Sequence, residues 1–226
     1  MPKKDPSKIC FIVCYNDEQY VQECNRYIHA LHVPDGMEIT TLFLTEADSM
    51  TSAYNYGMQN SHAKYKVYLH QDTFIIHKDF VPEILKIFSD PSIGMIGMVG
   101  SLHLPDNGMM WYGPRVGGLY ANVIYQTMES NFAPDCPAIN DVEAIDGFIM
   151  ITQYDLPWRE DLIQSWHFYD ISQSMEFRQH GYRIVVPAMP VPWCIHDQQI
   201  TSLNHYYEER EKFIREYAVY FQEHHI

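Results

Sequence analysis

The sequence predicts an α/β fold in which helices flank a mostly parallel central sheet. Short apolar runs rich in β-forming residues alternate with segments of helical periodicity over residues 8–101. The first run, "KICFIVCY" at 8–15, is apolar almost throughout, which is typical of a parallel strand buried on both faces. Repeated strand–helix–strand units favour right-handed crossovers that place the strands side by side.

The first half of the chain supplies four strands and three helices in alternation. The helix after the first strand is expected to begin near Asn16, with Gln19 three residues later as in a capping box. Asp79 is expected to cap the third helix. The remaining elements are expected in this order: strand 37–44, helix 48–63, strand 65–70, helix 78–90 and strand 93–101.

From residue 101 the pattern changes. The stretch 104–118 is rich in glycine and proline and predicts turns or a hairpin, and 142–152 reads as a strand interrupted by Asp-Gly. A helix from Asp170 should stop at Gly181 and lead into a strand. Without repeats or linkers, residues 1–226 are expected to form one domain, with a nucleotide-binding half at 8–100, an acceptor and catalytic half at 101–200, and a C-terminal helix at 203–223.

Composition excludes several classes of partner. The net charge is −14 and no cluster of lysine and arginine offsets it, which argues against nucleic acid and anionic membranes. No apolar run approaches the ~20 residues that a membrane span needs. No apolar segment follows the N-terminal lysines, so no secretory signal is expected and the cytoplasm is the predicted location. The five cysteines include no Cys-x-x-Cys pair and are expected to be reduced thiols.

One strand ends on three polar residues, His70, Gln71 and Asp72. In an open parallel sheet, ligands bind beyond the carboxyl ends of the strands. A carboxylate there can hold Mg²⁺ or Mn²⁺, which complete their coordination with substrate phosphates and water. Taken alone, Asp72 fits a turn or cap residue better than a metal ligand.

Five stretches occur in a characteristic order: "IVCYNDEQYVQEC", "SAYNYGMQNSHAKYKVYLHQD", "AIDGFIMIT", "WHFYDISQSMEFRQHGYRIVVP" and "CIHDQ". Together they resemble family 2 glycosyltransferases of the GT-A fold over residues 8–198, and most closely a subgroup with His-Gln-Asp in place of Asp-x-Asp. The sequence departs from the family pattern in four places, of which one is a short path from the second strand to the metal motif, as if one strand were deleted. "TEADSM" replaces Asp-Asp-Gly-Ser, Tyr54 stands where arginine is common, and His70 replaces the first acidic residue.

The resemblance implies a metal-dependent inverting glycosyltransferase acting in glycan or polysaccharide synthesis. The donor would be a nucleoside-diphosphate sugar, with a UDP-sugar favoured, and the acceptor a glycan or other hydroxyl compound. Asp170 would be the catalytic base, and Asp72 and His196 would ligate Mn²⁺ or Mg²⁺. The resemblance further assigns nucleotide or sugar contacts to Tyr15, Asn16, Glu46 or Asp48, His70, Gln71, Asp146 and Gly147.

Simpler interpretations stand beside these roles. Asp170 also fits a helix N-cap, Asp146 a β-bulge, and His196 an ordinary hydrogen-bonded histidine. A nucleotidyltransferase is an alternative function, although "CYNDEQY" lacks the glycine-rich loop and the basic residue that would hold a triphosphate. A catalytically idle domain that binds nucleotide or carbohydrate is another alternative. The C-terminal helix is expected to pack on the domain, and a homodimer contact or a membrane-edge contact through it stays open.

Overall fold

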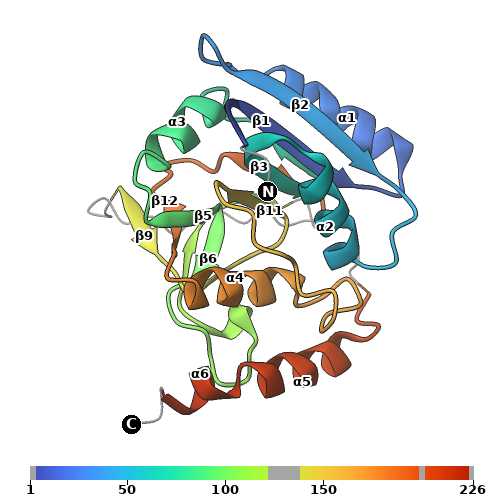
Figure 1. The fold of residues 1–226 in the computed structure, drawn as a ribbon, viewed down its shortest axis with the longest axis vertical. Helices are drawn as coiled ribbons and strands as arrows, with labels where there is room; N and C mark the ends of the chain where they lie inside the picture. The colour runs from blue at the N-terminus through green and yellow to red at the C-terminus, as the bar shows by residue number, and fades with distance from the viewer. Residues whose placement is uncertain (1–3, 122–137, 199–201, 224–226) are drawn as a thin grey trace.

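A seven-stranded sheet forms the centre of the protein, with helices on both of its faces (Figure 1). The computed structural model describes residues 4–121, 138–198 and 202–223. The strand order is β2-β1-β3-β11-β5-β12-β9. The strand bounds are Asp5–Cys14 (β1), Glu38–Leu44 (β2), Ala63–His70 (β3), Ile93–Gly97 (β5), Ile139–Asp141 (β9), Ile149–Thr152 (β11) and Arg183–Pro187 (β12).

Five of these seven strands point the same way. β1 pairs in parallel with both β2 and β3, and β12 pairs in parallel with β5. β11 is antiparallel to β3 and β5, and β9 is antiparallel to β12 at the edge of the sheet. The predicted α/β class with a mostly parallel sheet is confirmed, and the two reversed strands make the sheet mixed.

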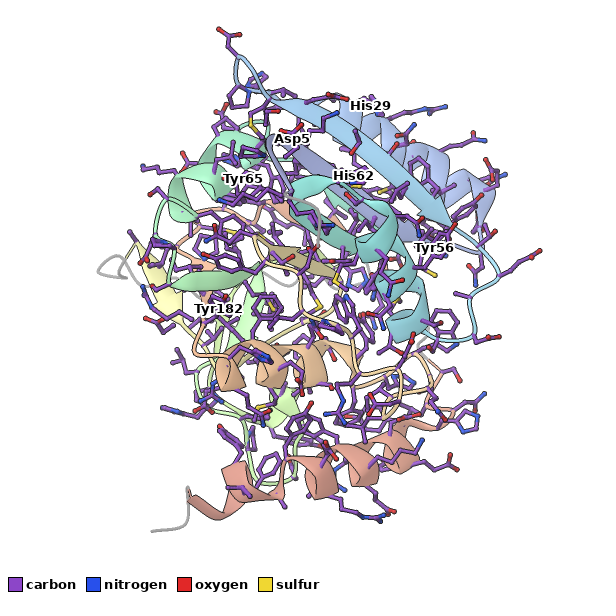
Figure 2. The ribbon with its side chains drawn as sticks, in the orientation of Figure 1. Asp5, His29, Tyr56, His62, Tyr65 and Tyr182 are labelled. Carbon is purple, nitrogen blue, oxygen red and sulfur yellow. The ribbon has the colours of Figure 1, made fainter. Side chains whose placement is uncertain are left out.

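The burial of β1 explains its continuous apolar sequence. On one face, Ile12 fills the space that Gly57 leaves open, because a Cβ at Gly57 would lie 2.5 Å from Ile12 Cγ2. On the other face, the ring centroid of Phe11 lies 6.5 Å from that of Phe80. Gly57 belongs to α2 and Phe80 to α3, so this strand is covered by a helix on each side. Side chains fill the space between the sheet and its covering helices, as the stick view shows (Figure 2).

The helices follow the predicted order, with differences at their ends. Their bounds are Glu18–His29 (α1), Met50–Asn60 (α2), Phe80–Ile87 (α3), Tyr169–Gln179 (α4), Tyr206–Glu216 (α5) and Ala218–Glu223 (α6). The predicted C-terminal helix 203–223 is thus two helices, with Tyr217 between them. Among the described residues, no helix is long and apolar enough to cross a membrane.

Two of the predicted caps differ from the structure. The first helix is capped by Asp17 and not Asn16, since the Asp17 carboxylate accepts hydrogen bonds from the backbone N–H groups of Gln19 and Tyr20. Asp79 makes no side-chain cap on α3. Its carboxylate instead contacts Nδ1 of His32 at 2.8 Å, which links the loop between α1 and β2 to the start of α3.

Two small three-stranded sheets extend the edge at which the ligand is expected. One contains β10 (Ala144–Ile145), β6 (Val99–Ser101) and β7 (Arg115–Gly117). β6 and β7 pair antiparallel, so the stretch 104–118, expected to form turns or a hairpin, contains the connection and the second strand of a hairpin that begins at Val99. The other contains β4 (Thr73–Ile75), β13 (Cys194–His196) and β8 (Tyr120–Ala121). The predicted strands 93–101 and 142–152 are each divided between the central sheet and the first of these small sheets.

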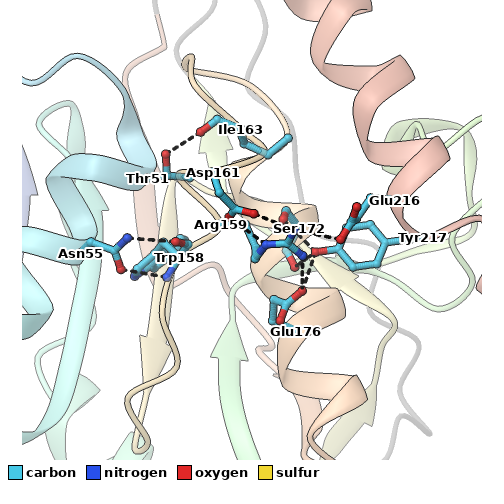
Figure 3. Close-up of polar contacts among 10 residues, drawn as sticks. All are labelled: Thr51, Asn55, Trp158, Arg159, Asp161, Ile163, Ser172, Glu176, Glu216 and Tyr217. Carbon is cyan, nitrogen blue, oxygen red and sulfur yellow. Dashed lines mark hydrogen bonds and ion pairs between the residues drawn. The ribbon is translucent and has the colours of Figure 1, made fainter.

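The loop between β11 and α4 is fastened to the surrounding helices (Figure 3). Asn55 of α2 exchanges two hydrogen bonds with the backbone of Trp158, at 2.8 and 2.9 Å. The hydroxyl of Thr51 donates to the carbonyl oxygen of Ile163 at 2.6 Å. Further along, Arg159 pairs with Asp161 and with carboxylates from α4 and α5. Because this loop leads directly into α4, these contacts position the first turn of that helix.

The cysteines that the structure describes are free thiols, namely Cys10, Cys14, Cys24 and Cys194. Burial raises the pKa of the Cys14 thiol to about 11 and that of Cys24 to about 12. These thiols are therefore protonated near neutral pH. Cys136 lies outside the described residues.

Candidate functional site

The expected ligand edge is where three parallel strands end together. Cys14 at the end of β1 lies opposite Leu44 on one side and His70 on the other. β11 runs the other way, so it starts at this same edge beside the end of β3. The backbone N–H of His70 donates to the carbonyl oxygen of Phe148 at 3.0 Å. The turn before β11 is thereby joined to the end of β3.

His70, Asp72 and His196 converge at this edge. His196 Nε2 lies 3.4 Å from Asp72 Oδ1 and 3.4 Å from His70 Nδ1, and His70 Nδ1 lies 4.0 Å from Asp72 Oδ1. The pairing of β4 with β13 places His196 opposite Thr73, next to Asp72. The predicted metal ligands Asp72 and His196 are therefore together, and His70 joins them as a third possible ligand.

The chemistry of this cluster fits a divalent cation. Asp72 Oδ1 is buried, with an imidazole nitrogen of His196 at 3.4 Å and one of His70 at 4.0 Å, and it makes no shorter hydrogen bond among the described residues. One carboxylate oxygen and two imidazole nitrogens around a common point are ligands that a divalent cation can use. Burial and the nearby His196 lower the pKa of His70 to about 4, so its imidazole is neutral at physiological pH. Burial raises the pKa of Asp72, but its interactions with the two histidines outweigh this effect and hold the pKa below its ordinary value.

Two residues that the sequence did not indicate support these ligands. The hydroxyl oxygen of Tyr169 lies 2.5 Å from His70 Nε2. The ring of Phe148 stacks on His196, with ring centroids 5.2 Å apart and planes at 17°. Tyr169 stands next to Asp170 in "FYD", and Phe148 follows Gly147 in "DGF", so each adjoins a predicted residue. No local pattern distinguishes them from ordinary core aromatics.

Asp170 lies on the first turn of α4, and its carboxylate bridges two elements. Oδ2 accepts a hydrogen bond from the backbone N–H of Gly147 at 3.0 Å, and Oδ1 accepts one from Ile171 N–H at 2.9 Å. The N-cap position of α4 belongs to Phe168, in a left-handed conformation, so Asp170 is not the N-cap. Burial, with the nearby Asp146 carboxylate, raises the pKa of Asp170 to about 7.

Asp146 and Gly147 form the turn between β10 and β11. Asp146 Oδ1 accepts a hydrogen bond from Phe148 N–H at 3.0 Å, and burial raises the pKa of this carboxyl. Gly147 has no room for a side chain, since a Cβ there would lie 2.1 Å from the hydroxyl oxygen of Tyr169. The glycine is thus explained by the close approach of Tyr169.

The predicted nucleotide-contacting residues lie at the same edge. Gln71 Oε1 accepts hydrogen bonds from the backbone N–H groups of Asn16 and Asp17 at 2.9 and 2.8 Å, and Gln71 Nε2 donates to Asn16 Oδ1 at 2.7 Å. The Gln71 amide therefore holds the loop between β1 and α1. Tyr15 N–H donates to Leu44 O at 2.9 Å, which joins this loop to the end of β2.

The two acidic residues after β2 are exposed. Glu46 has a φ of 55°, which is uncommon for a residue with a side chain. Asp48 precedes the N-cap residue of α2, Ser49. The structure thus places both of these candidate nucleotide contacts in the connection that leaves the ligand edge.

Comparisons with known proteins agree with this geometry. A family described as "Glycosyltransferase like family" matches residues 10–217. A search of curated proteins found no match. A mannosyltransferase from Pyrobaculum calidifontis, in complex with GDP-Man and Mn²⁺, has a similar structure, with a TM-score of 0.61 and 13% identity over 98% of this chain and 66% of that one.

Two further solved structures are similar. A Drosophila β-1,4-galactosyltransferase 7 mutant, in complex with manganese, UDP-Gal and xylobiose, has a TM-score of 0.53 and 11% identity over 88% of this chain and 73% of that chain. S. aureus TarS in complex with UDP-GlcNAc has a TM-score of 0.56 and 10% identity over 86% of this chain and 60% of that chain. This chain spans about two thirds of the length of such structures. These likenesses confirm the predicted GT-A fold.

Proposed function

Because the chain belongs to the glycosyltransferase-like family, we propose that it transfers a sugar from a nucleoside-diphosphate sugar to a hydroxyl acceptor, with a divalent cation held by Asp72, His196 and His70. The observation that carries this proposal is the convergence of the buried Oδ1 of Asp72 with the imidazole nitrogens of His196 and His70. It lies at the edge of the sheet where an open α/β fold binds its ligand.

The ion would be Mn²⁺ or Mg²⁺, and similar structures with bound manganese support this choice. When bound, the ion supplies positive charge that stabilises the departing diphosphate. The protein itself has a net charge of −14, and its described ligand edge carries Asp72, Asp146 and Asp170. A cation is therefore needed to bring a diphosphate close to these carboxylates.

The chain's own residues would bind and orient the donor. Gln71 and Asn16 fix the loop after β1, and Tyr15 joins that loop to the end of β2. Glu46 or Asp48 would accept hydrogen bonds from the base or the ribose. We propose a UDP-sugar as the donor, which is consistent with the UDP-sugar and GDP-sugar complexes of similar structures.

Asp170 would take the proton from the acceptor hydroxyl, so that transfer inverts the anomeric carbon in a single displacement. A general base works best when its pKa is close to the working pH, and a pKa of about 7 satisfies that condition. The N–H groups of Gly147 and Ile171 orient the carboxylate. Asp146 raises its basicity and, with Gly147, would line the sugar site.

The test is metal-dependent binding and turnover of nucleoside-diphosphate sugars. We expect UDP or GDP to bind in the presence of Mn²⁺, and the corresponding sugar nucleotide to be hydrolysed slowly without acceptor. Asp72→Asn should abolish the metal-dependent part of nucleotide binding, because a carboxylate ligand of a hard ion is lost. Asp35→Asn is the matched control, since Asp35 is exposed in the turn before β2, at the opposite end of that strand.

Calorimetric titration with UDP and GDP, with and without Mn²⁺, measures the effect. Unchanged Mn²⁺-dependent affinity in Asp72→Asn would contradict the proposed site. Normal metal-dependent binding without any sugar release or transfer would instead indicate a domain that binds its ligand and does not catalyse.

A further inference from the structure

Tyrosine side chains from two segments of the second half gather beside Asp170. Tyr206 and Tyr207 begin α5, and Tyr112 ends a short 3-10 turn between β6 and β7. Tyr207 is 58% exposed and Tyr112 75%, and exposed aromatic side chains that gather in one place commonly mark a binding surface. We propose that this tyrosine cluster (Tyr112, Tyr206 and Tyr207) binds the acceptor, and that the acceptor is a neutral saccharide. The inference rests on the proposed function, because it names the acceptor class for that same site.

The ring of Tyr206 joins the cluster to the proposed base. Its centroid lies 5.0 Å from that of Phe168, two residues before Asp170, and 5.4 Å from that of Tyr207. Burial and the negative charge of the nearby Asp170 carboxylate raise the pKa of the Tyr206 hydroxyl. A general base must reach the hydroxyl group whose proton it takes. A sugar held against the Tyr206 ring would bring its hydroxyl groups to Asp170.

The connection between β6 and β7 is held against α5, which brings Tyr112 to the same surface (Figure 1). Arg210 Nε donates a hydrogen bond to the carbonyl oxygen of Asn107 at 2.6 Å. Gly108 packs so closely that a Cβ there would lie 3.3 Å from side chains of α5. Besides burial, the nearby phenol of Tyr112 contributes to the raised pKa of Tyr206. The two segments that form the cluster are thus fixed relative to each other before any ligand binds.

The chemistry of the cluster favours a neutral sugar. A tyrosine offers a flat apolar ring for the C–H face of a pyranose and a hydroxyl group for its polar edge. The surroundings carry the carboxylates of Asp170 and Glu208, and the Glu208 side chain is 73% exposed and contacts Nδ1 of His205. Two nearby cations have partners, since Arg210 donates to a backbone carbonyl oxygen and Arg115 lies over an indole ring. A phosphate or carboxylate on the acceptor would be repelled here, whereas a neutral sugar would not.

The experiment measures the binding of a fixed panel of compounds by saturation-transfer NMR, in the presence of UDP and the diamagnetic ion Mg²⁺. The neutral members are cellobiose, lactose, xylobiose and chitobiose, and the anionic members are glucuronate and glycerol 3-phosphate. We expect at least one neutral disaccharide to bind the wild type, and its affinity to fall about tenfold in Tyr207→Ala and in Tyr112→Ala. The anionic compounds should not bind.

Two further variants show whether the aromatic ring carries the effect. Tyr207→Phe keeps the ring and should bind the disaccharide within about twofold of the wild type. Tyr56→Ala is the matched control, because Tyr56 of α2 is 60% exposed, close to the exposure of Tyr207, and is not part of the cluster. Since Tyr207 is exposed, its removal should leave the fold intact, and UDP affinity in the presence of Mn²⁺ should be unchanged in every variant.

The outcomes separate this inference from the proposed function. The inference is overturned if no neutral disaccharide binds, if one binds equally well to Tyr207→Ala and Tyr112→Ala, or if the anionic compounds bind in place of the neutral ones. Sedimentation with phosphatidylcholine vesicles that depends on Tyr207 would likewise overturn it, and would identify the cluster as a membrane contact. A wild type that binds a disaccharide through the cluster but does not bind UDP with Mn²⁺ would contradict the proposed donor site and leave the saccharide surface standing.

Discussion

Replacing Asp170 with asparagine removes a carboxylate and keeps nearly the same shape. The amide oxygen of the variant can accept one of the two hydrogen bonds that the carboxylate receives from Gly147 and Ile171. The other N–H then faces an amide nitrogen, which costs about 1 kcal/mol. Since the variant also loses a buried charge, the fold should survive, and the change tests the chemistry of the residue.

The expected loss of activity follows from the role of a general base. Such a group contributes about 10²- to 10⁴-fold to the rate, so Asp170→Asn should transfer sugar at least about 100-fold more slowly. Nucleotide and Mn²⁺ affinity should stay near wild type, because the carboxylate contacts the acceptor. In the wild type, kcat/KM should rise with pH through about 7, where the carboxyl loses its proton, and the variant should lack this rise.

The Asp170 carboxyl should also make the free energy of unfolding depend on pH, which is a second and independent test. Its pKa is about 7 in the folded protein against an ordinary 3.8. Between these values the folded chain binds more protons than the unfolded chain, so the free energy of unfolding falls as the pH rises from about 4 to about 7. About 1.4 kcal/mol per pKa unit gives an upper bound of about 4 kcal/mol for this fall. This fall in the free energy of unfolding should be absent in Asp170→Asn.

One preparation of each protein serves for all three measurements. Transfer rate and donor affinity are measured at several pH values, and urea unfolding is followed from about pH 3.5 to about pH 8, which spans the two pKa values. Near-wild-type turnover in Asp170→Asn would refute the assignment of the base, and Asp146 would become the next candidate. A variant whose unfolding free energy keeps the wild-type pH dependence would refute the burial argument.

Two more changes test the surroundings of the site. His196→Ala should raise the Mn²⁺ concentration needed for half-maximal activity by about tenfold or more, and a metal-bound structure with the imidazole turned away would remove His196 from the site. Because two of the three candidate donors are imidazole nitrogens, Mg²⁺ should activate the wild type more weakly than Mn²⁺. Gly147→Ala should lower the unfolding free energy by about 1–3 kcal/mol and weaken Mn²⁺ binding, because the new Cβ would lie 2.1 Å from the Tyr169 hydroxyl oxygen; normal Mn²⁺ affinity would show that Tyr169 can shift without consequence.

The sequence predicted the parts of the fold that depend on local periodicity. Alternating apolar runs and helical segments indicated β1, β2 and β3 with their crossovers, and hence the edge where His70 and Asp72 lie. The direction of β11 was not predictable in this way, because an apolar run of four residues is compatible with either orientation. This reversed strand is what brings Gly147 and Phe148 to the end of β3.

The contact between His196 and the metal motif depends on information that a local pattern does not contain. His70 and His196 are 126 positions apart, and they meet because β4 pairs with β13. Each of these strands has three residues, too few to show a period. The resemblance to a known family suggested His196 as a candidate ligand, whereas the physical reading of the residues left it open.

Three features at or near the ligand edge break local rules that sequence reasoning relies on. Phe168 adopts φ 61° immediately before Tyr169 and Asp170, although a bulky residue rarely occupies the left-handed region. Glu46 does the same after β2, and the Oδ1 atom of Asp72 is buried with His196 Nε2 at 3.4 Å. Each feature costs free energy, and such costs concentrate where binding or catalysis requires them.

Such a site needs a rigid frame, and the loop before α4 provides part of it. Asn55 and Thr51 hold this loop from α2, and Arg159 pairs with Glu176 and Glu216 to join it to α4 and α5 (Figure 3). None of these residues contacts a proposed ligand directly. They oppose the relaxation of Phe168, and thereby keep the Tyr169 hydroxyl at His70 and the Asp170 carboxylate at Gly147. The polar network of the second half is therefore expected to help position the proposed metal site at the end of β3.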